Sequence, residues 1–224
     1  MQTLQRAVDD IDGIVLLTDD GARGEHDLAR LLRQAASGAA VSKFVLIAES
    51  TELLDEDVVR ADPGVSVLRL AVPMPTLTGA FNDARVTGRL RVPFALTREL
   101  AYVDMGDVAD VVQTALTGED LDQQTVWLAS TVGVDAHGLA RLMGAALGRE
   151  VTAEHWPLEQ MLNGFAPGPF KDHVERVYSA YDRSGVPGKV DTLRHLLDRE
   201  PRTLSTYLNE LLWTYGPNPA LRRD

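Results

Sequence analysis

Lys43-Phe44-Val45-Leu46-Ile47-Ala48 contains the longest unbroken apolar run of the chain. Bulky β-branched and aromatic residues that do not alternate with polar ones are typical of a strand covered on both faces, and such strands lie centrally in parallel sheets. We therefore expect a central strand here, with helices over residues 25–37 and 52–60 packed on the sheet faces. A ligand site is then expected beyond Glu49 and Ser50, where the strand ends.

Other apolar segments extend this pattern along the chain. Residues 14–17 and 65–72 are expected strands, so the order is β-α-β-α-β, and short right-handed crossovers make the sheet parallel. Residues 74–98 are expected to form a helix and a short hairpin folded over the sheet. Next we expect a helix with Asp107 as its N-cap. A strand over 125–129 and a helix over 136–147, ended by Gly148, follow.

The fold class predicted from these segments is α/β with a parallel sheet. The 224 residues, 45% of them hydrophobic, suit one large core with a small appended lobe. We divide the chain into an α/β domain over residues 1–150 and a helical lobe over residues 151–224, packed on that domain as a substrate lobe or lid.

Composition excludes several classes of function. The formal net charge of −11 argues against a nucleic-acid or anionic-membrane surface, because a phosphate backbone would be repelled. The chain has no cysteine, and four of its histidines show no metal-ligand spacing with one another, so no metal site is expected. With acidic residues near the N-terminus in place of a signal peptide and no membrane-length apolar run, we expect a cytoplasmic protein.

Six segments carry a resemblance to a known family. Their order along the chain is that seen in NmrA-like proteins of the atypical short-chain dehydrogenase/reductase group. The segments are residues 4–17, 41–48, 68–69, 102–109, 147–149 and 198–203. The resemblance implies a Rossmann-type fold. Members generally bind NADP(H) or NAD(H), and some reduce quinones while others act as nucleotide-sensing regulators.

Two departures from the family pattern bear on cofactor use. In the family, the segment resembling residues 4–17 follows a first βαβ unit with a glycine-rich phosphate loop, whereas this chain begins at that segment, as an incomplete Rossmann-like sheet. Residues 21–24 (Gly-Ala-Arg-Gly) precede a helix but do not form the G-x-G-x-x-G motif. After the central strand there is also no Tyr-x-x-x-Lys pair to protonate a carbonyl. We therefore expect no nicotinamide cofactor.

The expected pocket has candidate chemical groups at its rim. Carboxylates beside an apolar cleft can act as acid or base, so Glu49 and Asp19 are the first candidates, with His26 as a possible base. Each also has a plain structural interpretation, as a helix-capping acid or a solvated helix residue. The expected substrate-binding residues are Ser50, Met74, Asn82, Tyr102, Trp156, Phe165 and Phe170. The aromatic residues of the lobe, Tyr178 and Tyr181 among them, are expected to form its core, although the turn over residues 164–170 could also cover an aromatic or polyketide-like ligand.

The strand at residues 14–17 is expected to leave an open sheet edge, because the family's first strand would pair beside it. Open edges attract partners. We expect the edge near Ile14–Leu17 to be covered by the same strand of a second copy in a homodimer, by residues 1–12, or by a separate protein.

Three functions remain open from the sequence. The favoured one is a protein that binds an apolar small molecule and catalyses a cofactor-independent, non-redox step such as a cyclisation, dehydration or isomerisation. The second is a non-catalytic regulatory or interaction protein. The third is an NAD(P)H-dependent reductase whose nucleotide-binding half is supplied elsewhere.

Overall fold

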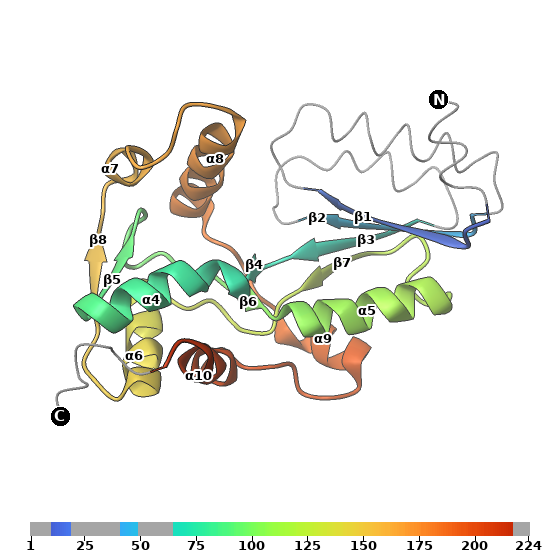
Figure 1. Cartoon of the computed structure of the whole chain (residues 1–224). Coiled ribbons are helices and arrows are strands. Elements are labelled where there is room, and N and C mark those ends of the chain that lie inside the picture. Colours follow the sequence, from blue (N-terminus) through green and yellow to red (C-terminus); the bar gives the residue numbers. More distant parts are fainter. Residues whose placement is uncertain (1–9, 19–40, 49–64, 217–224) are drawn as a thin grey trace.

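The main sheet has four parallel strands. The structure, a computed structural model, describes residues 10–18, 41–48 and 65–216. The strand order is β1-β2-β3-β7, and every pair in it is parallel (Figure 1). The strands are β1 (Gly13–Thr18), β2 (Lys43–Ala48), β3 (Val65–Leu70) and β7 (Thr125–Leu128). The prediction that residues 43–48 form an interior strand of a parallel sheet is therefore confirmed.

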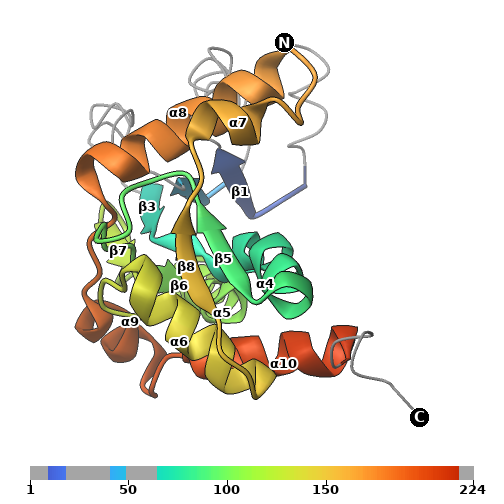
Figure 2. The same cartoon turned by 90° about the vertical axis from the view of Figure 1, so that its left-hand side faces the viewer.

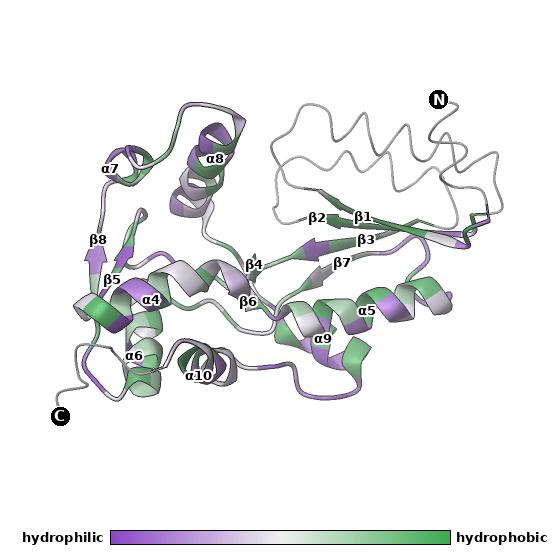
Figure 3. Ribbon diagram, viewed as in Figure 1, coloured by the Kyte–Doolittle hydropathy of each residue, from purple (hydrophilic) through white to green (hydrophobic). Residues whose placement is uncertain are grey.

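The side chains of β2 are buried on both faces of the sheet. Val45 and Ile47 belong to the large hydrophobic core, and helix α5 (Met105–Thr117) packs against β2 (Figure 1). Phe44 and Leu46 belong to a separate cluster with residues of β3. Hydrophobic residues follow one another along β1, β2 and much of β3 (Figure 3). The helices predicted over residues 25–37 and 52–60 lie outside the described residues.

Two short parallel pairs continue from the main sheet. β4 (Val72–Pro73) pairs with β6 (Tyr102–Val103), and β5 (Arg89–Val92) pairs with β8 (Thr152–His155). The predicted hairpin in residues 74–98 is therefore wrong. This region forms a 3-10 turn, η1 (Met74–Thr76), then α4 (Leu77–Thr87) and β5. Strand β5 finds its partner far along the chain, because a parallel pair needs a long crossover.

The helices of the second half surround these short strands. They are α6 (Ala136–Leu147), α7 (Leu158–Leu162), α8 (Pro169–Ser184), α9 (Val190–Leu197) and α10 (Leu204–Tyr215). Helix α6 has the predicted bounds, and Gly148 ends it with a positive φ of 62°. Helix α10 packs on α6 and α4, α9 packs on α5 and β7, and α8 lies apart on the opposite side from α10 (Figure 2). None of the helices in the described ranges is long and apolar enough to span a membrane.

The N-terminus of α5 differs from the prediction. Asp104, not Asp107, is the N-cap, and its carboxylate accepts hydrogen bonds from the backbone N–H groups of Gly106 and Asp107. Asp107 stands one turn further in and is only 2% exposed. The spacing of the apolar stripe fits both positions, because Asp is a good N-cap at either. Tertiary packing decides between them, because the Asp107 carboxylate binds residues of other segments of the chain.

Asp107 is the centre of a polar network that joins distant segments. Its carboxylate accepts hydrogen bonds from the Ser130 hydroxyl, the Arg199 guanidinium and the backbone N–H of Arg202, at 3.1, 2.8 and 2.8 Å. The Arg202 guanidinium also donates to Asp104 at 3.3 Å. The family-like segments 102–109 and 198–203 therefore bind each other, which gives them a structural role in this chain.

Strand β1 lies at one end of the described sheet. Val15 and Leu17, on the same face as the core residue Val45, are 44% and 57% exposed. This arrangement agrees with the expected edge position. Coverage of that edge by a second copy or by another protein stays a prediction, which light scattering of the purified chain would test.

A glycine inside α4 provides a first test of the fold. An added Cβ at Gly79 meets no atom within 4 Å, and the residue is exposed in the helix. We expect Gly79→Ala to raise the free energy of unfolding by about 0.5–1 kcal/mol, because alanine loses less backbone entropy in a helix. Urea denaturation of the variant and the wild type measures this difference. A destabilised variant would mean that α4 does not present this face to solvent.

Candidate functional site

A cavity of about 220 Å³ lies between α8, α4, β5 and β6. Helix α8 supplies one wall, the first turns of α4 a second, and β5 with the loop after it a third. Most of the lining side chains are apolar or aromatic. They are Val72, Thr76, Leu77, Ala80, Leu90, Arg91, Val92, Pro93, Phe94, Leu100, Tyr102, Leu139, Phe170, His173, Val174, Val177, Tyr178 and Tyr181. An apolar pocket with a few polar groups is the usual form of a small-molecule site.

The wall formed by α8 is built on aromatic contacts. Tyr178 stacks on Phe94 with ring centroids 6.4 Å apart, and its edge meets Tyr181 at 5.8 Å. The carboxylate of Asp182 accepts a hydrogen bond of 2.7 Å from the backbone N–H of Ala95, which ties the C-terminal end of α8 to the loop after β5. The tyrosines of α8 are therefore held against the rest of the cavity.

The Tyr102 side chain enters the cavity from β6, whose backbone is fixed on both sides. The Tyr102 N–H donates to the Thr131 hydroxyl at 2.9 Å, and the Tyr102 carbonyl accepts from the N–H groups of Ser130 and Thr131. The side chain is 3% exposed. The phenol thus has a defined position before any ligand arrives.

Burial raises the pKa of the Tyr102 phenol far above its ordinary value of 10.0, and the nearby Tyr178 phenol raises it further. Burial also raises the pKa of Tyr178. Both hydroxyls therefore stay protonated at neutral pH, as hydrogen-bond donors. An uncharged donor in an apolar pocket can bind a carbonyl or a phenolate oxygen.

The raised pKa of Tyr102 predicts a loss of stability in alkali. Below pH 10.0 the phenol holds its proton in both states, but above it only the unfolded chain ionises, so stability falls as pH rises. One pH unit above that value, the loss from one such residue is about 1.4 kcal/mol. We expect Tyr102→Phe to remove this part of the decline, as measured by urea denaturation at neutral and alkaline pH. Equal declines in both proteins would contradict the burial of the phenol.

Three other polar side chains of the cavity already have partners. The Arg91 guanidinium pairs with Asp83 and Glu154, both at 3.6 Å, and lies over the Trp156 ring. The Thr76 hydroxyl donates to the Pro73 carbonyl at 2.7 Å. His173 also interacts with another group of the chain.

The structure brings together only some of the predicted site residues. Asp19, His26, Glu49 and Ser50 lie outside the described residues, so their roles stay predictions. Tyr102 and Phe170 line the cavity, and Phe170 is 66% exposed.

The remaining predicted residues do not line the cavity. Phe165 packs on Phe170 with ring centroids 5.6 Å apart, and Trp156 lies against Arg91. Met74 is fully buried, and Asn82 lies on α4. Their part in ligand binding also stays a prediction.

The sequence predicts Tyr178 and Tyr181 as core residues of the lobe and predicts no binding role for His173. A signal was present, because His173, Val174, Val177, Tyr178 and Tyr181 recur at helical spacing and so share one face of α8. That pattern predicts a buried helix face. It does not predict that the face borders a cavity, because the opposing wall comes from α4 and β5.

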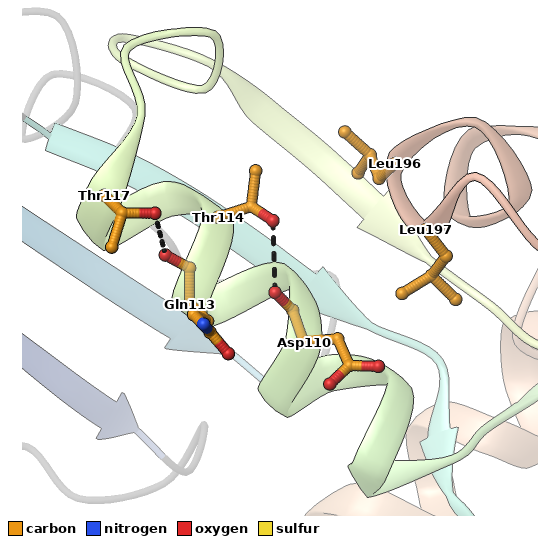
Figure 4. Close-up of a pocket in the computed structure, with 6 residues that line it drawn as sticks. All are labelled: Asp110, Gln113, Thr114, Thr117, Leu196 and Leu197. Carbon is orange, nitrogen blue, oxygen red and sulfur yellow. Dashed lines mark hydrogen bonds between the residues drawn. The ribbon is translucent and has the colours of Figure 1, made fainter.

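A second hollow, of about 290 Å³, lies between α5 and α9. Its lining residues are Asp110, Gln113, Thr114, Thr117, Leu196 and Leu197 (Figure 4). The Thr114 and Thr117 hydroxyls donate to the Asp110 and Gln113 backbone carbonyls, as the dashed lines in Figure 4 mark, and Asp110 pairs with Arg199. Most of its polar groups are therefore used within the protein, which makes it a weaker candidate than the aromatic cavity.

A metal ion and a dinucleotide each need a particular set of residues. Within the ranges that the structure covers, no three His, Asp or Glu side chains are grouped to hold a metal ion. A dinucleotide in a Rossmann-like fold rests its pyrophosphate on a glycine-rich turn between a strand and a helix. The G-x-G-x-x-G sequence does not occur in the 224 residues. The residues present do not fit the usual cradle, so no step is assigned to a nicotinamide.

Known proteins resemble the chain in structure but not in sequence. No family model and no curated protein matches it. A nucleoside-diphosphate-sugar epimerase from Staphylococcus aureus superposes with a TM-score of 0.79 at 18% identity, over 93% of this chain and 80% of that chain. Citrobacter sp. triphenylmethane reductase complexed with NADP(H) gives 0.77 at 16%, over 94% and 80%. A double mutant of NmrA gives 0.70 at 12%, over 93% and 76%.

These superpositions confirm the fold that the resemblance implied. The chain has the Rossmann-like α/β fold of these proteins, NmrA among them.

Proposed function

We propose that this Rossmann-like chain binds an apolar aromatic small molecule in the cavity between α4 and α8. We further propose that it catalyses a cofactor-independent, non-redox step on that molecule, such as a cyclisation, dehydration or isomerisation, in the cytoplasm. The observation that carries the proposal is the composition of the cavity. Its wall is mainly aliphatic and aromatic, and its phenols remain protonated.

The size of the cavity limits the ligand. A cavity of about 150 Å³ lined by apolar side chains is enough for benzene. A cavity of about 220 Å³ therefore suits one or two fused rings. Burial of such a ring system supplies binding free energy through the apolar area that leaves water.

The proposed catalysis needs polarisation of one ligand oxygen. Fixed hydrogen-bond donors in a water-poor site stabilise negative charge that develops on such an oxygen, and this is a large contribution in many enzymes. The Tyr102 phenol meets these conditions, since its backbone is fixed and its side chain is buried.

A thermal-shift assay with two classes of compound tests this function. Naphthalene-sized aromatics are expected to raise the Tm, because a ligand at about 100 times its Kd adds about 2.7 kcal/mol. NADPH and NADH are expected to leave it unchanged. In Ala80→Phe a ring fills the cavity, so the aromatic shift should vanish, whereas Ala109→Phe on the exposed side of α5 should keep it. The absence of any aromatic shift in the wild type would refute the proposal.

A second candidate is an NAD(P)H-dependent reductase. The observation that favours it is the similarity of fold to a triphenylmethane reductase that was solved with NADP(H). A clear Tm shift with NADPH, followed by turnover of a dye or quinone, would support this reading and contradict cofactor independence.

A further inference from the structure

Two phenol groups of the cavity are available to a bound ligand. In the described residues, neither the Tyr102 nor the Tyr178 hydroxyl makes a hydrogen bond, although Tyr102 is 3% exposed and Tyr178 is half-buried. Neither hydroxyl oxygen is among the fully buried atoms that lack a partner, so water or a ligand in the cavity can reach both. A ligand with an acceptor atom would supply the missing bond to both.

The other polar side chains of the cavity are engaged. Arg91 is held by two carboxylates and Thr76 by a backbone carbonyl, while His173 and Tyr181 each interact with other groups of the chain. The phenols of Tyr102 and Tyr178 are therefore well placed to select a ligand by its polar atoms.

Both phenols are held in place from different parts of the chain. Tyr102 is fixed by the backbone bonds of β6, and Tyr178 is fixed by stacking on Phe94. They line one cavity, Tyr102 from β6 and Tyr178 from α8. Because neither needs to be ordered on binding, their hydrogen bonds cost little entropy.

We propose that the Tyr102 and Tyr178 hydroxyls both donate to one oxygen of the bound ligand, so that the cavity selects one- or two-ring aromatic compounds that carry a carbonyl or an ionisable phenolic oxygen. This inference rests on the proposed function, and it adds the ligand class and the two residues that recognise it. Acidic phenols are favoured because their oxygen carries negative charge at accessible pH, and hydrogen bonds to a charged acceptor are about twice as strong as neutral ones.

Naphthalene and 2-naphthol are a matched pair of probes for this inference. They share one ring system and differ by one oxygen. We expect the wild type to bind 2-naphthol about 5- to 150-fold more tightly, since two net hydrogen bonds of about 0.5–1.5 kcal/mol each are gained. The double variant Tyr102→Phe with Tyr178→Phe should bind both probes about equally. Tyr181→Phe, in the same cavity, and Tyr207→Phe, whose hydroxyl contacts Thr78, should keep the preference.

The ionisation of bound 2-naphthol provides a second measurement. An apolar cavity without donors raises the pKa of a bound phenol, whereas two donors aimed at its oxygen lower it. Absorbance titration should show a lower pKa for the bound probe than for the free one in the wild type, and a higher one in the double variant.

The outcomes separate the two proposals. If neither probe binds the wild type, the proposed function fails. If both bind the wild type equally, or if the double variant keeps the preference and the lowered pKa, only the role of the two phenols is refuted. Retained naphthalene binding shows that the double variant is folded.

Discussion

Asp107→Ala is expected to lower the free energy of unfolding by about 3 kcal/mol. The substitution leaves the Ser130 hydroxyl and the backbone N–H of Arg202 without their acceptor, and each unpaired buried group costs about 1–3 kcal/mol. Asp107 is 2% exposed, so water does not readily replace the lost carboxylate. Urea denaturation of the variant and the wild type at neutral pH measures the difference.

Asp110 provides the matched control for this experiment. It pairs with the same Arg199 guanidinium but its side chain is 57% exposed. Exposed ion pairs contribute about 0–1 kcal/mol, so Asp110→Ala should change stability by less than about 1 kcal/mol. Similar losses of stability in Asp107→Ala and Asp110→Ala would mean that only the contact with Arg199 stabilises the fold. That result would contradict the role assigned to the buried Asp107 carboxylate.

Gly188→Ala is the second substitution with a large expected effect, a loss of about 3 kcal/mol. An added Cβ would overlap the Thr131 carbonyl oxygen and the Ala101 Cβ. Neither neighbour can rotate away, because the Thr131 N–H bonds to Tyr102 and the Ala101 N–H bonds to Val186. Overpacking of this kind costs about 1–3 kcal/mol, and rigid neighbours place this site at the upper end.

Thermal and urea denaturation of Gly188→Ala test this prediction, with Gly79→Ala as the control. The two variants carry the same substitution, yet opposite signs are expected, since only Gly188 lies against fixed atoms. A stabilised Gly188→Ala protein would show that the segment before α9 is not packed on β6. Because Ala101 precedes Tyr102, weaker naphthalene binding should accompany the loss.

The strands of the main sheet could be predicted because their signal is local. Apolar runs at residues 14–17 and 43–48 predict strands, and the structure has strands there, although only the second is buried on both faces. Helix α6 was predicted with its bounds, because an apolar stripe and a following glycine are also local features. Asp107 was predicted as the N-cap of α5 from the same kind of local signal. That prediction is wrong, because the Asp107 carboxylate binds Ser130, which follows β7, and Arg199, which follows α9.

The candidate site was less predictable. Tyr102 and Phe170 were expected at a pocket, and they line the cavity. The α8 tyrosines were expected only as core. Nothing local distinguishes a core tyrosine from one that borders a cavity, because the difference lies in whether the opposing wall fills the space beside it.

The sequence by itself determined the α/β class, the parallel sheet and the positions of most of its strands, because hydrophobic spacing and turn residues act over a few neighbours along the chain. Only the tertiary structure decided that β5 pairs with β8, that Asp107 binds the segment before α10, and that Tyr102 and Tyr178 line one cavity. These contacts join segments that are far apart in sequence, and they form only where the packed elements leave matching surfaces in reach of each other.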